Sequence, residues 1–104
     1  MSAESANVTS LDGYQAEARR TINRALTDDQ RLMDAAAGLA EEAGEVLSHV
    51  RKHVMQGRTL DRDAVTLELG DALWCLSVAA DTLGVALQDV ARLNIEKLRS
   101  RYPD

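Results

Sequence analysis

The sequence predicts an all-α fold, a bundle of four to five helices in a single domain. Apolar residues recur at helical spacing through most of the chain, and no segment shows the sustained alternation of a strand. The only proline, Pro103, is the penultimate residue, so no proline interrupts a helix. A length of 104 residues fits one domain. We expect residues 1–9 to form a flexible N-terminal tail and residues 10–104 to form the helical domain.

Caps and apolar spacing define the first two predicted helices. Ser10 can cap a first helix, whose apolar positions continue as far as Leu26. Residues 27–29 indicate a turn and a new cap, so a second helix is expected over about residues 29–53. Its apolar stripe recurs every three or four residues, at Leu32, Ala35, Leu39, Ala43, Val46 and Val50.

The third predicted helix, over about residues 62–82, follows a loop and can be capped by Asp61. Residues 69–80 are apolar almost all round, which is typical of a helix buried on more than one side. A monomer of this size rarely encloses one helix fully. We therefore predict a homo-oligomer with this helix in the subunit interface. Gly84 is expected to end the helix, and a last helix follows over about residues 86–101.

Composition and charge argue against several classes of protein. The net charge is −5 and no basic run is longer than two residues, which argues against nonspecific binding to nucleic acid. No apolar stretch approaches the roughly 18 residues of a membrane span, and no signal peptide is evident. The single cysteine, Cys75, lies in an apolar stretch and is interpreted as a small buried hydrophobe. We therefore predict a cytoplasmic protein without nucleic-acid or membrane partners.

Four acidic residues lie where a soluble helix would normally place apolar ones. Glu42 and Glu45 are three residues apart, so both project from one face of their helix. Glu68 and Asp71 have the same spacing, and basic residues one turn away are scarce. A buried carboxylate is costly unless it is paired or binds a metal, and oxygen ligands alone favour Mg²⁺ or Mn²⁺. The alternative is that the acids are solvated, as most acidic residues on helices are.

The last predicted helix carries a polar stripe. Asn94, Lys97 and Arg101 fall on one side of it, and such residues can bind the free oxygens of a polyphosphate. Taken alone, they are better explained as a solvated face, because basic residues also suit the C-terminal end of a helix. Trp74 can stack on a nucleobase, although a core position is the more usual role of a tryptophan.

Two segments together resemble a known signature. Residues 41–45 (EEAGE) and 68–71 (ELGD) are similar to the EExxE…ExxD motif of the all-α NTP pyrophosphatase superfamily. Residues 70–74 (GDALW) and 94–103 (NIEKLRSRYP) resemble its MazG-like branch. The resemblance covers most of the chain, from about Tyr14 to Pro103.

The resemblance implies hydrolysis of the α–β phosphate bond of a nucleoside triphosphate, with Mg²⁺, to a monophosphate and pyrophosphate. It implies that Glu41 is an additional metal ligand or the base that activates water, and that Lys97 binds phosphate. Many relatives carry a tyrosine where this chain has Cys75, which leaves the contacts to the nucleobase open. Trp74, Asn94 and Arg101 are further candidates for contact with the nucleotide. The metal ligands implied by the motif are Glu42, Glu45, Glu68 and Asp71.

Two alternatives stay open from the sequence. Phosphoribosyl-ATP pyrophosphatases use similar acids, so the chemistry is better specified than the substrate. A metal-stabilised helical interaction or regulatory module without catalysis belongs to a different class of function. Five carboxylates at the motif positions argue against that second alternative, because a catalytically dead relative need not keep them.

Overall fold

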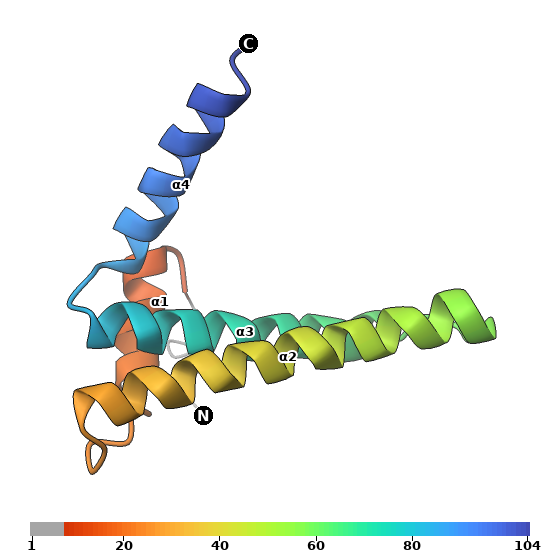
Figure 1. Ribbon diagram of the computed structural model, residues 1–104, viewed down its shortest axis with the longest axis horizontal. Helices are drawn as coiled ribbons and strands as arrows, with labels where there is room; N and C mark the ends of the chain where they lie inside the picture. Colours follow the sequence, from red (N-terminus) through yellow and green to blue (C-terminus); the bar gives the residue numbers. More distant parts are fainter. Residues whose placement is uncertain (1–7) are drawn as a thin grey trace.

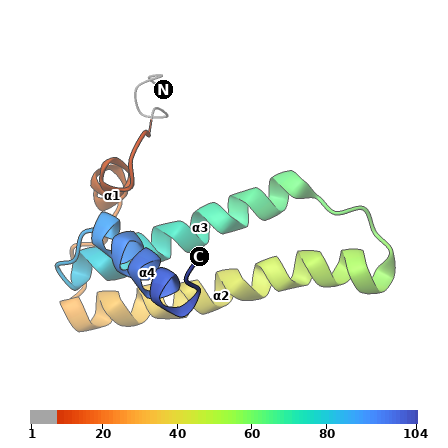
Figure 2. The same cartoon turned by 90° about the horizontal axis from the view of Figure 1, so that it is seen from above.

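The computed structural model describes residues 8–104, which form four helices. They are α1 (Leu11–Arg19), α2 (Asp28–Gln56), α3 (Arg62–Thr82) and α4 (Leu87–Arg101). The long helices α2 and α3 run side by side in opposite directions, as Figures 1 and 2 show. α1 lies across the end of this pair where α3 finishes, and α4 turns away from α3 (Figure 1). The predicted all-α class is confirmed. Residues 1–7 of the predicted tail lie outside the described part of the chain.

Local capping explains where α2 and α3 begin and end. The hydroxyl of Thr27 accepts a hydrogen bond from the backbone N–H of Gln30, whose side chain accepts one from the N–H of Thr27, so the two form a capping box. Gly57, at a φ of 66°, ends α2 in a left-handed conformation that favours glycine. Asp61 then caps α3 by accepting from the N–H of Ala64 at 3.0 Å. These boundaries agree with the sequence to within a turn.

The first helix is shorter than the sequence predicts. α1 ends at Arg19, whereas apolar spacing suggested a helix as far as Leu26. The hydroxyl of Thr21 donates to the carbonyl of Ala18 at 2.7 Å, and the side-chain oxygen of Asn23 accepts from the backbone N–H of Ala25 at 3.0 Å. Such side-chain bonds to nearby backbone compete with helical hydrogen bonding, so the chain forms turns before α2 begins.

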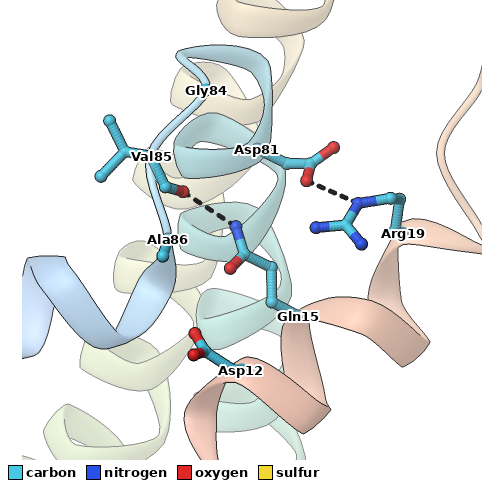
Figure 3. A pocket seen from close by; sticks show the side chains of 7 residues that line it. All are labelled: Asp12, Gln15, Arg19, Asp81, Gly84, Val85 and Ala86. Carbon is cyan, nitrogen blue, oxygen red and sulfur yellow. Dashed lines mark hydrogen bonds and ion pairs between the residues drawn. The ribbon is translucent and has the colours of Figure 1, made fainter.

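Gln15 of α1 fixes the start of α4. The α3–α4 connection passes through Gly84, at a φ of 72°, and α4 has no side-chain cap of its own. Instead, the side-chain NH₂ group of Gln15 donates to the carbonyl of Val85 at 3.0 Å (Figure 3). The side-chain oxygen of Gln15 accepts from the backbone N–H of Leu87 at 2.8 Å. Gln15 is only 4% exposed, so these bonds are shielded from water. Beside them, the guanidinium of Arg19 pairs with Asp81 on α3 (Figure 3).

Replacing Gln15 by leucine is expected to destabilise the fold by about 2–3 kcal/mol, because it leaves two buried backbone groups without partners. Urea unfolding of the two proteins measures the loss. Gln88→Leu is the matched control, since Gln88 is exposed on α4 and should tolerate the same change. Equal stability of Gln15→Leu and the wild type would show that the two hydrogen bonds of the Gln15 side chain do not stabilise the fold.

A single chain does not form a closed bundle. α4 departs from α3 at a bend of 102°, and the Cα radius of gyration is 16.1 Å, against about 13 Å for a compact chain of this length. In the described part of the chain, no single helix is long and apolar enough to cross a membrane, and α3 with α4 meets that test only as this bent pair. Large apolar side chains are left exposed on three helices: Met33, Leu47 and Val54 on α2, Leu67, Leu69 and Leu76 on α3, and Val90, Leu93 and Leu98 on α4.

Candidate metal centre

α2 and α3 pack tightly next to the predicted acids. A Cβ atom placed on Gly38 would lie 2.9 Å from the Sγ atom of Cys75, so the absence of a side chain lets the two helices meet. Cys75 is 5% exposed, which confirms that it is a buried residue. Because the helices are antiparallel, one turn beyond Gly38 brings Glu42 level with Asp71, one turn before Cys75.

We expect Gly38→Ala to destabilise the protein by about 1–2 kcal/mol, because the new methyl group displaces the buried sulfur of Cys75. Gly44→Ala on the same helix is the matched control. No atom lies within 4 Å of the Cβ position of Gly44, so this change should stabilise the helix by about 1 kcal/mol. Thermal or urea unfolding of both variants measures the difference, and a stabilised Gly38→Ala would contradict the close approach.

Three of the predicted acids converge between α2 and α3. Glu42, Glu68 and Asp71 each offer a carboxylate oxygen, and these oxygens lie within 4.8 Å of one another. Glu42 and Glu68 are half-buried and Asp71 is exposed. Glu41 and Glu45 lie on the adjacent, exposed surface of α2 and are not part of this trio. The helix register thus assembles one acid from α2 and two from α3.

The acidic trio lacks protein partners for its charge. Among residues 8–104, none of its members forms an ion pair, and one buried oxygen of Glu42 has no hydrogen-bond partner. Loss of hydration raises the pKa of Glu42, and the neighbouring carboxylates of Glu68 and Asp71 raise it further. Carboxylates that crowd together in this way, without a cation from the protein, suit a hard divalent ion with oxygen ligands.

The predicted phosphate-binding residues lie elsewhere. Asn94, Lys97 and Arg101 belong to α4, which points away from the α2–α3 pair in a single chain (Figure 1). Asn94 lines a small pocket of about 290 Å³ together with Leu73 of α3, and none of the three acids lines that pocket. One chain therefore does not bring the predicted phosphate-binding residues to the acids.

Two aromatic side chains, Trp74 and Tyr14, lie on the helices α3 and α1 near the centre. The indole N–H of Trp74 donates to the hydroxyl of Thr21 at 2.7 Å, which ties α3 to the turn after α1. Tyr14 of α1 is half-buried, and loss of hydration together with the negative charge of Asp71 raises the pKa of its phenol. No motif of the sequence pointed to Tyr14 beside the acids, because only the packing of α1 on α3 places it there.

Comparison with known proteins agrees with this geometry. A family profile described as the MazG nucleotide pyrophosphohydrolase domain matches residues 30–104. The chain belongs to this family. The matched MazG region contains α3, α4 and nearly all of α2, and therefore every acid of the centre. α1 and the turn that follows it precede the match.

Two curated proteins are similar to this chain over part of their length. The Gene 37 protein of Mycobacterium phage L5 is 37% identical over 68 residues, which cover 62% of this chain and 60% of that protein. The uncharacterized protein YvdC of Bacillus subtilis (strain 168) is 32% identical over 73 residues, which cover 62% of this chain and 69% of that protein. No solved structure matches the chain.

Proposed function

We propose that the protein is a Mg²⁺-dependent pyrophosphohydrolase, with Mn²⁺ as a possible substitute, that converts a nucleoside or deoxynucleoside triphosphate to a monophosphate and pyrophosphate. The observation that supports it most is the convergence of Glu42, Glu68 and Asp71, whose oxygens lie within 4.8 Å of one another. Membership of the MazG family supports the reaction class. The acidic, cysteine-poor chain suits the cytoplasm, where nucleotide pools and reduced thiols occur.

The proposed ligands of the metal are the trio and Glu45, which lies one turn beyond Glu42 on α2. The bound cation would supply charge neutralisation and polarisation of the phosphate oxygens. Glu41, exposed beside Glu42, would accept a proton from the attacking water. The water oxygen then bonds to the α-phosphorus as the bond to the bridging oxygen of the α–β anhydride breaks. Pyrophosphate leaves with that oxygen.

Lys97 would stabilise the charge that develops on the leaving pyrophosphate, with Asn94 and Arg101 as additional contacts. These residues lie on α4, away from the acids of the same chain. We therefore propose a homo-oligomer, a dimer or tetramer, in which the exposed apolar residues of α3 and α4 are covered by a second copy. Assembly would also bury the apolar surface that the open arrangement of one chain leaves in water.

Thermal melts in the presence of Mg²⁺ test the proposed centre directly. A ligand that binds only the folded state raises its stability, so the melting temperature should rise with millimolar Mg²⁺. Glu68→Gln should remove this rise because it deletes one charged ligand of the trio. Asp63→Asn, at the exposed start of α3, is the matched control and should keep the rise. Melts that are indifferent to Mg²⁺ and Mn²⁺ would favour an interaction module without metal.

The metal response should depend on pH with a definite sign. The pKa of Glu42 is raised in the folded protein, so the proton is held more tightly there than in the unfolded chain. In the metal-free protein, Glu42 therefore contributes its full stabilisation at a pH below the pKa that it has in the unfolded chain. This contribution is lost as the pH rises through the pKa of Glu42 in the folded protein. Metal binding needs the carboxylate, so the Mg²⁺-induced rise in melting temperature should grow over the same pH range.

A further inference from the structure

A pocket with both polar and apolar walls lies upstream of the acids, where the turn before α2 meets the first turns of that helix. Its volume is about 670 Å³. The turn contributes Asn23 and Leu26, and α2 contributes Asp29, Gln30, Met33 and Asp34. We call it the Asp34 pocket. Asn23, Leu26 and Asp29 precede the region matched by the MazG family profile, and the other lining residues lie within it.

The Asp34 pocket shares one side of α2 with Glu41 and Glu45, whereas Glu42 of the trio projects about a quarter turn away. Asp34 precedes Glu41 by seven residues and Glu45 by eleven, which are both close to whole numbers of helical turns. Seven residues correspond to a rise of about 10 Å along the helix axis. That separation suits a nucleotide whose phosphates lie at the acids and whose base lies at Asp34.

The free hydrogen-bonding groups of the Asp34 pocket form a defined set. The side-chain oxygen of Asn23 accepts from the N–H of Ala25, and that of Gln30 accepts from the N–H of Thr27. Each amide therefore keeps its NH₂ group free to donate. The carboxylate of Asp34 forms no ion pair or hydrogen bond among the described residues, and it can only accept. Met33, 71% exposed, offers an apolar surface beside these polar groups.

This set of donors and acceptors distinguishes between nucleobases. A carboxylate can accept two parallel hydrogen bonds, and guanine presents two adjacent donors, N1–H and the 2-amino group, on one edge. The neighbouring O6 atom of guanine is an acceptor, which a side-chain NH₂ group can satisfy. Adenine, cytosine and uracil each lack the paired donors. Guanine is therefore the common base that the pocket matches best.

We propose that the Asp34 pocket binds the base of the substrate and selects guanine, an inference that rests on the proposed function. Asp34 accepts from N1–H and the 2-amino group. The free NH₂ group of Asn23 or Gln30 donates to O6, and Met33 packs against the face of the ring. Asp34 acts in recognition only, since it lies two helical turns from the acids proposed to bind the metal.

Comparison of GTP with ITP isolates the contact that carries the proposal, because inosine is guanine without the 2-amino group. With Mg²⁺, the wild type should show kcat/KM for GTP at least about tenfold above that for ITP, the effect of one charge-assisted hydrogen bond. Asp34→Asn should lower this ratio towards one, mainly by raising KM for GTP. Asp63→Asn, an equally conservative change at an exposed site on α3, should keep the wild-type ratio.

A binding measurement without metal separates the pocket from the reaction. In EDTA, GMP should shift the backbone amide resonances of residues 29–34, IMP should do so more weakly, and Asp34→Asn should abolish the GMP effect. If GTP and ITP are hydrolysed equally well by the wild type, the Asp34 pocket is not the base site, although the proposed function stands. If no nucleotide is hydrolysed but GMP binding depends on Asp34, the pocket binds guanine as proposed and the proposed function is wrong. If GMP causes no shift, the inference is overturned.

Discussion

Replacing Glu42 by glutamine is expected to lower kcat for nucleotide hydrolysis by about 10²–10³-fold or more, the size of effect seen when one charged contact to a transition state is removed. Glu42 is the member of the trio contributed by α2, and one of its buried oxygens has no protein partner. The substitution keeps the size of the side chain and the helix propensity but removes the charge. Glu45→Gln should have a comparable effect if Glu45 completes the set of ligands.

Stability provides the control for this variant. Glu42→Gln removes one charge from a crowded set of carboxylates, so the metal-free protein should become more stable at neutral pH even as it loses activity. Glu96→Gln, an exposed change on α4 that breaks only the pair with Arg92, should leave activity unchanged. An active Glu42→Gln variant, or one that is inactive because it is unfolded, would not fit a metal centre at this position.

Replacing Leu76 by arginine is expected to dissociate the oligomer and to abolish hydrolysis with it. Leu76 is 44% exposed on α3, and Leu69, two turns before it, is 55% exposed on the same side of the helix. A charge in the centre of an apolar interface is left unpaired and desolvated, which costs several kcal/mol. Light scattering at low micromolar concentration should show a dimer or tetramer for the wild type and a monomer for the variant.

Gln88→Arg is the matched control, because it adds the same charge to an exposed, polar position on α4. It should keep the oligomeric state and the activity of the wild type. A wild-type protein that is a well-folded monomer at these concentrations would contradict the predicted interface. A monomeric, fully active Leu76→Arg variant would show instead that one chain suffices for the reaction.

Local periodicity accounts for the parts of the structure that the sequence predicts well. Glu42, Glu68 and Asp71 stand out because acidic residues interrupt apolar stripes, and helical spacing places each on the inner face of its helix. The caps at Ser10, Thr27 and Asp61 are likewise local, since each bonds to a backbone N–H three residues later. The sequence pattern predicted that the acids would be more buried than they are. Asp71 is exposed to solvent because the groove between α2 and α3 is not covered on that side.

Contacts between residues far apart in the chain explain what the sequence could not predict. The direction of α4 depends on Gln15, which a sequence reading treats as one more polar residue of α1. Tyr14 lies beside Asp71 only because α1 packs on α3, and the Asp34 pocket exists because a turn folds against the start of α2. The end of α1 was missed because hydroxyl and amide side chains after Arg19 compete with helical hydrogen bonds.

Identification of the products of nucleotide hydrolysis tests the central claim most directly. Purified protein is incubated with each common NTP and dNTP and millimolar Mg²⁺, and the phosphorus products are resolved by ³¹P NMR. The account predicts equal amounts of nucleoside monophosphate and pyrophosphate, abolished by EDTA and by Glu42→Gln. Orthophosphate and a diphosphate would place the cleavage at the β–γ bond, and no turnover of any nucleotide with Mg²⁺ or Mn²⁺ would contradict the assignment of the acids to catalysis.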